Sequence, residues 1–503
     1  MIARPRNIQD IAELQKALGI RSRKSVLALS EARDPFNTGS PANYRDAEWF
    51  AKQWDDRGFT GLTNIHLRKN HYKNVVLGEK QVPLGRRITY KMDGKDCFAD
   101  YYENTDPVWS YLSESGAKAR YLGLVPPDSF VDRRNPKPII NSEPFWTMQP
   151  SINIEDVAEW TLPSIQFDFS ENIDWRVPSL SASGYWYDKG CQPYMIELWC
   201  EKSTMDDIII PLCNKFDANY VPATGFQSIT GAINLLQRAK NYNKPVRIFY
   251  ISDFDPAGDT MPVAVSRQIE YWFEKYSPGV DIKVKPLVLT LDQINHYELP
   301  DAPIKGSDKR AAKFEALYGV SGAVELDALD AIHPGELEKI ISGAFKDYRD
   351  PTLADRLWST RNQVNQRLES ATNDLRRAVE DEIGEIRSEA MGILGKYQER
   401  LQAVNRELQT DFAPLQERLN DLRRAVEDDL SKIKVELPDR PKAKVQLSDK
   451  SKWLFDSDRN YIKQLRSYKD RSQCVIHTPD YESITTSEKE QDEIFSLLEE
   501  VAL

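Results

Sequence analysis

Acidic side chains follow two apolar segments of this 503-residue chain that have the composition of buried strands. Glu201 and Lys202 come directly after MIELWC, and Asp253 and Asp255 come just after VRIFYI, within SDFDPAGD. Ligands of open α/β sheets bind outside the carboxyl ends of the strands, so neighbouring strands would bring the three carboxylates together. Carboxylates without histidine or cysteine form a hard-oxygen site that suits Mg²⁺. The sequence therefore predicts that Glu201, Asp253 and Asp255 bind Mg²⁺.

The same residues also have structural interpretations. An acid at a strand end often caps the following helix, and Lys202 is as well suited to a salt bridge as to a phosphate contact. The spacing D-x-D-P-x-G favours a site, because Pro256 and Gly258 would form a tight turn that directs both aspartates outward.

The elements that would position these acids alternate regularly within residues 191–350. Apolar, β-branched segments are expected to be strands, and amphipathic segments of 10–15 residues are expected to be helices. The strands are expected at 195–201, 218–225, 246–252 and 280–290, with helices at 203–216, 226–242 and 264–276. This alternation predicts a mostly parallel sheet covered by helices, so the fold class is α/β with additional α-helical parts.

Residues 1–140 contain several short amphipathic segments with basic side chains, which is typical of a helix-turn-helix or winged-helix DNA-binding domain and equally of a generic small helical domain. One of these expected helices lies within 63–78. Its candidate DNA contacts are Arg68, Lys69, His71 and Lys73.

The remaining segments are a connector at 141–190, rich in proline, serine and aromatic residues, a helical arm at 351–435, and a polar tail at 436–503. Apolar residues of the arm follow the 3/4 spacing of a coiled coil, and the octapeptide DLRRAVED occurs at both 374–381 and 421–428. The arm is either one long helix or a hairpin that folds back near Gly392–Gly395.

The formal net charge of −11 does not by itself exclude a nucleic-acid partner. Residues 1–150 carry 23 basic and 18 acidic side chains, whereas 151–350 carry 19 and 30. A basic nucleic-acid-binding part joined to a carboxylate-rich part is compatible with these numbers. No apolar run approaches the roughly 18–20 residues that span a bilayer. Five scattered cysteines and the absence of an apolar leader favour a cytoplasmic protein of a prokaryotic cell, plasmid or virus.

Taken together, the motifs of the α/β part resemble a Toprim domain. The motifs are E-K after the first strand, a glycine turn after the second (Gly225) and D-F-D-P-x-G after the third. More narrowly, they are similar to the Toprim domain of the topoisomerase VI A subunit and the related meiotic double-strand-break protein. AVELDAL at 323–329 is similar to the family segment K-x-E-I-x-A-L, without its leading lysine.

That family also carries a nucleophilic tyrosine in a winged-helix domain, in a pattern close to L-R-x-x-[YF]-Y. Here L-R-K-N-H-Y matches it, with Arg68 and Tyr72 at the family positions and His71 in place of the usual aromatic residue. Tyr90 and the pair Tyr101–Tyr102 follow no such pattern. The arm and the tail lie outside the resemblance, as in orphan A-subunit-like proteins of viruses, plasmids and bacteria.

The resemblance implies Mg²⁺-dependent cleavage of double-stranded DNA by a homodimer, in which Tyr72 attacks a backbone phosphorus and becomes linked to a 5′ end. Arg68 would stabilise the phenolate and the transition state. The chain has no G-x-x-x-x-G-K-[ST] phosphate loop, so ATP-driven strand passage would need a separate B-subunit-like ATPase. The implied catalytic residues are Tyr72, Arg68, Glu201, Lys202, Asp253 and Asp255.

Two other functions stay open from the sequence. The first is a Toprim nuclease of a defence system, plasmid or phage, which hydrolyses DNA with water and does not need Tyr72. The second is a non-catalytic DNA-binding or bridging protein whose acids have lost their role.

Overall fold

The computed structural model describes 40–78, 80–131, 135–155, 177–222, 228–276, 278–305, 308–397, 405–445, 453–459 and 461–474, together with a few single residues. The chain divides into two compact units. The first unit, called here the α/β unit, draws on 1–145, 193–349 and 445–503, and the second, called the arm unit, on 146–192 and 350–444.

The N-terminal part of the α/β unit is built from three helices and an antiparallel hairpin. The elements are α3 (Pro41–Asp56), α4 (Leu67–Val76), β1 (Pro83–Met92), β2 (Lys95–Tyr101) and α5 (Asp106–Tyr121). Their core is aromatic: Phe50 and Trp54 of α3 pack against Phe130. Short helices were expected in this part, one of them within 63–78, and α4 confirms that helix. The winged-helix assignment stays a prediction.

The hairpin between β1 and β2 was not predicted, although its signal is present in the sequence. Met92 pairs with Lys95, so Asp93 and Gly94 form a two-residue turn, and both have positive φ (51° and 77°). Asp-Gly is the preferred sequence for such turns, since both central residues must adopt the left-handed region.

Five strands form the central sheet in the order β11-β8-β7-β5-β6. Their bounds are β5 Met195–Cys200, β6 Asn219–Pro222, β7 Val246–Ile251, β8 Ile282–Val288 and β11 Phe455–Asp456. The first four are parallel to their neighbours, and β11 is antiparallel to β8. The predicted α/β class with a mostly parallel sheet is therefore confirmed, and β5 and β7 are direct neighbours.

Helices cover both faces of this sheet because the strands are apolar on both sides. On β5, Leu198 belongs to one core cluster and Trp199 to the other. The first cluster includes residues of α6 (Asp206–Lys215), α11 (Leu326–Ile332) and α12 (Glu336–Lys346), and the second includes residues of α7 (Ile229–Tyr242) and α8 (Pro256–Tyr276). The shorter α9 (Leu291–His296) and α10 (Ala311–Tyr318) complete this part.

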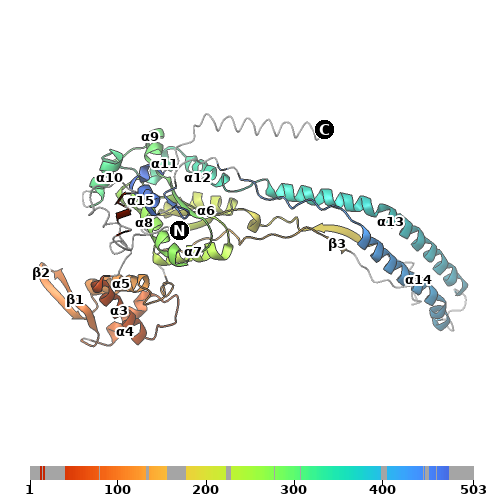
Figure 1. The fold of residues 1–503 in the computed structure, drawn as a ribbon, viewed down its shortest axis with the longest axis horizontal. Helices are drawn as coiled ribbons and strands as arrows, with labels where there is room; N and C mark the ends of the chain where they lie inside the picture. Colours follow the sequence, from red (N-terminus) through yellow and green to blue (C-terminus); the bar gives the residue numbers. More distant parts are fainter. Residues whose placement is uncertain are drawn as a thin grey trace. The chain divides into compact units, whose positions relative to one another are not determined.

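The arm unit contains two long helices, α13 (Leu353–Tyr397) and α14 (Asn405–Lys432), which lie side by side (Figure 1). The hairpin alternative for the arm is thus confirmed, but α13 continues through Gly392 and Gly395, so the turn is not located there. Residues 398–404 lie outside the described part. The two DLRRAVED copies meet in one cluster, which contains Val379 of the first copy and Val426 of the second.

Two predicted boundaries are wrong. The 141–190 connector contains an antiparallel ribbon, β3 (Ser151–Glu155) and β4 (Ser179–Ser183), whose Ala182 packs against Val364 and Leu368 of α13. Similarly, 436–503 is not a single polar tail. Its first residues belong to the arm unit, whereas 453–474 supply β11, α15 (Tyr461–Lys469) and Arg471 to the α/β unit. No described helix is long and apolar enough to cross a membrane.

Candidate active site

The candidate site lies where the strand order of the sheet reverses. Counted along the chain, the four parallel strands have the order 2-1-3-4, so β5 and β7 flank the topological switch point. Ligands of doubly wound sheets bind at this point, beyond the carboxyl ends of the strands. Glu201 follows β5 and Asp253 and Asp255 follow β7. The N–H of Glu201 donates to the carbonyl of Ile251 at 3.3 Å, which joins the two strand ends.

Glu201 is the one of the three acids for which the described residues provide no structural role. Its side chain is partly buried, and among the described residues it has no hydrogen bond or ion pair. Burial raises its pKa, and the negative charges of Asp253 and Asp255 raise it further, while Lys202 and Arg310 act in the opposite direction. A partly buried carboxylate that is destabilised by its neighbours and has no partner is typical of a site that binds a cation.

Lys202 is the centre of an ion-pair cluster. Its Nζ lies 3.1 Å from Asp253 Oδ1 and 3.2 Å from Glu325 Oε2, and it also donates to Asp327. Burial alone would lower the pKa of Lys202, but the bonds to Asp327, Asp253 and Glu325 raise it well above its usual value. Lys202 is therefore a permanently charged residue that ties the β5 end to the segment before α11. This arrangement favours the salt-bridge interpretation and keeps the charge within reach of a ligand at Asp253.

Asp253 has one structural contact and one charged partner. Its Oδ1 accepts the backbone N–H of Leu326 at 2.7 Å and the ion pair from Lys202. Burial nevertheless raises the pKa of Asp253; the Leu326 N–H and Lys202 oppose this increase, and Asp255 adds to it. The ion pair therefore outweighs burial in the pKa of Lys202, whereas burial outweighs the ion pair in the pKa of Asp253.

Asp255 caps helix α8. Its Oδ1 accepts the N–H of Gly258 at 2.6 Å, and Pro256 occupies the first helical position, where no donor is lost. Gly258 is required by space, because a Cβ there would lie 2.1 Å from the carbonyl oxygen of Asp253. The predicted tight turn is therefore present. One carboxylate oxygen of Asp255 is used in capping the helix, as the helix-cap interpretation predicted. Its other oxygen can still bind a metal.

The donor set fits Mg²⁺ in its chemistry. All candidate ligands are carboxylate oxygens, and Glu201 and Asp253 both have raised pKa values that a nearby cation would reverse. The three acids are not a closely packed cage: in the described part of the chain, the one group of carboxylates with ligand atoms all within 4.8 Å of one another is elsewhere. Mg²⁺ usually keeps several waters and binds one or two protein carboxylates, so a looser set is compatible with it.

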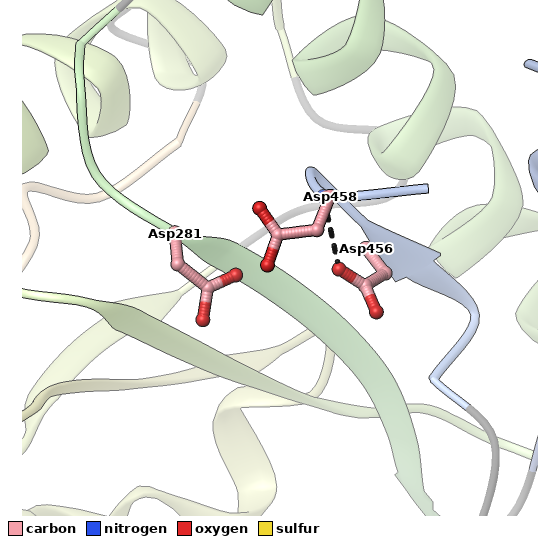
Figure 2. Close-up of side chains that lie close together, drawn as sticks. All are labelled: Asp281, Asp456 and Asp458. Atoms are coloured by element: carbon pink, nitrogen blue, oxygen red, sulfur yellow. Dashed lines mark hydrogen bonds between the residues drawn. The ribbon is translucent and has the colours of Figure 1, made fainter. Parts of the chain in front are cut away.

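That closely packed group consists of Asp281, Asp456 and Asp458 (Figure 2). Asp281 directly precedes β8, and the other two lie at the β11 turn, where the N–H of Asp458 donates to Asp456 Oδ1 at 3.0 Å. Basic side chains already neutralise this group. Arg247 donates to Asp281 at 2.7 Å, and Lys283 lies 3.8 Å from Asp281 and 3.6 Å from Asp456. We therefore regard it as a structural ion-pair network.

A cavity of about 250 Å³ opens beside the Asp253 turn, at the ends of β7 and β8. Its polar floor is the buried ion pair between Asp259 and Arg471, to which Tyr318 donates a hydrogen bond at 2.7 Å. Sequence reasoning missed this pair, although Asp259 belongs to the D-x-D-P-x-G-D segment. Arg471 lies 212 positions away in a stretch that was expected to be a polar tail.

The candidate nucleophile lies on α4. Tyr72 is 55% exposed, and Arg68, one turn earlier on the same helix, is exposed as well. Their spacing of four residues places both side chains on one face. Among the described residues, Tyr72 has no hydrogen bond, its ring packs against the ring of His71, and no hydrogen bond joins it to Glu201 or Asp253. The pairing of this tyrosine with the acids therefore stays a prediction.

His71 is buried and does not face solvent, so its predicted role as a DNA contact is wrong. Its Nδ1 lies 2.7 Å from Tyr102 Oη and its Nε2 lies 3.1 Å from Asn104 Oδ1. Burial lowers the pKa of His71, which the Asn104 bond opposes and the charge of Arg68 reinforces. The neutral ring fixes α4 against the segment that follows β2 and thereby positions Tyr72.

The other predicted DNA contacts of α4 differ in how free they are. Lys69 is exposed, whereas Lys73 donates to the carbonyl of Arg57 and lies 4.5 Å from the ring centre of Phe59. Gly225, the glycine of the turn after β6, lies outside the described residues.

Neither a family model nor a curated protein matches this chain. The case for its function therefore depends on its own residues.

Proposed function

We propose that this protein cleaves double-stranded DNA by Mg²⁺-dependent transesterification, with Tyr72 as the nucleophile. The observation that carries the proposal is the position of Glu201, Asp253 and Asp255 at the switch point of a parallel sheet, with Glu201 lacking any described partner. Separately, α4 presents an exposed tyrosine and an exposed arginine one turn apart.

The reaction balances without an external reagent. The phenolic oxygen of Tyr72 loses its proton to solvent and forms a bond to the scissile phosphorus, the bond from phosphorus to the 3′ oxygen breaks, and the 3′ oxygen takes up a proton from solvent. The products are a 5′-phosphotyrosyl link and a free 3′ hydroxyl. The new ester bond conserves the energy of the broken phosphodiester bond, so the step can be reversed. Arg68, one turn before Tyr72 on the same helix, would stabilise the phenolate that forms.

The three acids would hold Mg²⁺, which supplies charge neutralisation at the scissile phosphate and at the leaving oxygen. Lys202 holds Asp253 in place through its ion pair. By analogy with the A-subunit family, the proposal includes a homodimer, in which the tyrosine of one protomer serves the acids of the other, and a separate ATPase subunit where strand passage occurs.

A metal-dependent nuclease that uses water is the second candidate. One observation favours it: Asp253, Lys202, Glu325 and the N–H of Leu326 form one contiguous cluster that includes no atom of Tyr72. In this alternative, α4 would contribute only to DNA binding.

Denaturing gels of supercoiled plasmid incubated with the protein and Mg²⁺ distinguish the candidates. We expect a covalent protein–DNA adduct that is lost in Tyr72→Phe and retained in Tyr101→Phe, a matched variant of another exposed tyrosine. Cleavage that persists in Tyr72→Phe but not in Glu201→Gln would replace the proposal with the nuclease. Binding without cleavage would leave a DNA-bridging protein.

A further inference from the structure

A row of alternating tryptophan and arginine side chains lies on the arm unit. Its members are Trp146, Arg440, Trp186, Arg361 and Trp358; interactions connect the first four, and Trp358 lies three positions before Arg361 on α13. The three tryptophans are 36%, 53% and 67% exposed in the same order. Most proteins bury tryptophan, so three exposed indoles with two arginines beside them in one unit require an explanation.

The two arginines hold the indole rings in place. The guanidinium carbon of Arg361 lies 3.8 Å from the ring centre of Trp186, and that of Arg440 lies 5.6 Å from the ring centre of Trp146. Arg440 also donates to the carbonyls of Gly184 and Trp186, both at 2.7 Å. Trp358 lies one turn before Arg361 on α13 and therefore beside it. The row is preorganised, since its arginines are fixed by stacking and by the backbone.

Arg361 keeps unused donors. None of the described residues accepts a hydrogen bond from its guanidinium or forms an ion pair with it, and its Nε is buried without a partner. A guanidinium that stacks on an aromatic ring leaves the edges of its Nη groups available, and such edges suit phosphate oxygens.

Three segments that hold four of the five row residues are basic in a chain of net charge −11, whereas Glu143 lies three positions before Trp146. The segments 184–190, 355–367 and 436–444 carry seven basic side chains and four acidic ones. The basic residues are Lys189, Arg356, Arg361, Arg367, Arg440, Lys442 and Lys444. The acidic ones are Asp188, Asp355, Glu436 and Asp439. A polyanionic partner complements this surface, whereas a second copy of the same row would oppose guanidinium to guanidinium.

We propose that this tryptophan–arginine row binds single-stranded DNA, with unpaired bases on the indoles and phosphates on Arg361 and its basic neighbours. Aromatic platforms combined with cations bind single strands without strong sequence preference. Duplex DNA presents phosphates to the arginines, but its base faces are stacked inside the helix and cannot contact the indoles. This inference does not depend on the proposed cleavage by Tyr72.

Fluorescence anisotropy of a labelled oligothymidylate of about 20 nucleotides, longer than the roughly 4–16 nucleotides that single-strand-binding folds cover, tests the proposal on the full-length protein. We expect Trp358→Ala to raise Kd at least about fivefold, as loss of one stacked base typically does. Met391→Ala, an exposed large-to-small change on the same helix, should leave Kd unchanged.

Arg361→Gln gives a second, independent readout. Loss of one phosphate contact should reduce the slope of log K against log salt by about 0.7, whereas Arg418→Gln, an arm arginine paired with Glu389, should not change the slope. All measurements are repeated in Tyr72→Phe, where single-strand binding should persist even if cleavage is lost.

Three results would overturn the inference. The first is a Kd that stays within twofold in Trp358→Ala. The second is tighter binding of an RNA strand or of duplex DNA of equal charge through the same residues. The third is displacement of the oligonucleotide by polyglutamate at equal charge, which would show that the row binds an acidic polypeptide and does not read bases.

Discussion

Two carboxylate groups of the α/β unit have similar composition and opposite chemical states. Asp281, Asp456 and Asp458 are packed within 4.8 Å, yet Arg247 and Lys283 neutralise them. Glu201, Asp253 and Asp255 are packed less closely, and Lys202 pairs with Asp253 while Glu201 has no described partner.

The difference shows that proximity alone does not identify a cation site. A compact group of acids is stable without a metal when basic side chains supply the counter-charge, as the group at β8 and β11 does. At the switch point the basic side chains do not balance the negative charges of the acids. The pKa values of Glu201 and Asp253 are therefore raised. The looser group is therefore the better candidate site, and the predictions below compare the two.

Glu201→Gln should have the largest effect. We expect DNA cleavage to fall by more than about 100-fold, because even outer-shell partners of metal ligands are typically worth 10–100-fold. Asp281→Asn, the matched change in the neutralised group, should cleave within about threefold of the wild-type rate, since no step of the proposed reaction involves Asp281. Initial rates from plasmid cleavage gels give both values.

Equal losses of activity in the two variants would remove the distinction between the groups. Normal cleavage in Glu201→Gln would exclude the switch-point acids as the metal site, whatever the role of Tyr72. Folding of both variants is checked by circular dichroism before rates are compared.

Sequence reasoning found the acids of the switch point because each follows an apolar strand, and strands joined by helices form parallel sheets with their carboxyl ends on one edge. It missed β11, since two residues that pair through backbone hydrogen bonds leave no side-chain pattern. The burial of His71 was also missed, because its partners Tyr102 and Asn104 lie more than 30 positions away. Long-range pairing of polar groups leaves no local signal.

Gly258→Ala should destabilise the switch-point group without changing its charges. The added Cβ would lie 2.1 Å from the carbonyl oxygen of Asp253, so the β7–α8 turn must shift, at a cost of about 3 kcal/mol in the free energy of unfolding. Gly343→Ala on α12 is the control, because its Cβ meets open space and alanine favours helix by about 1 kcal/mol. Urea unfolding measures both, and a neutral Gly258→Ala would show that the turn relaxes.

Asp281→Asn should reduce stability, in contrast to its small effect on cleavage. Arg247 is 5% exposed and would lose its charged acceptor, so we expect the free energy of unfolding to fall by about 2 kcal/mol. Mg²⁺ should raise the melting temperatures of this variant and of the wild type by the same amount, because the metal would bind at the other group. Loss of the Mg²⁺ shift in Asp281→Asn would reassign the metal to the β8–β11 acids.

The smallest expected effect is a pH dependence that separates Glu201 from Asp46, a buried acid of α3. The folded pKa of Glu201 is raised, so the native state holds its proton longer than the unfolded chain does, and the cost of its charge develops as pH rises above about 4.5. The melting temperature of Glu201→Gln should therefore equal that of the wild type at low pH and exceed it near pH 7, and Mg²⁺ should cancel the difference.

For Asp46, burial would raise the pKa, but the bonds from Lys118 and Tyr111 and the charge of Arg86 lower it. Its stabilisation is present above its unfolded pKa and is lost as pH falls through the folded pKa, so Asp46→Asn should lose stability near pH 7 and approach the wild type in acid. Parallel curves for the two variants would mean that Glu201 carries no unmatched charge, and the contrast between the two carboxylate groups would then have no physical basis.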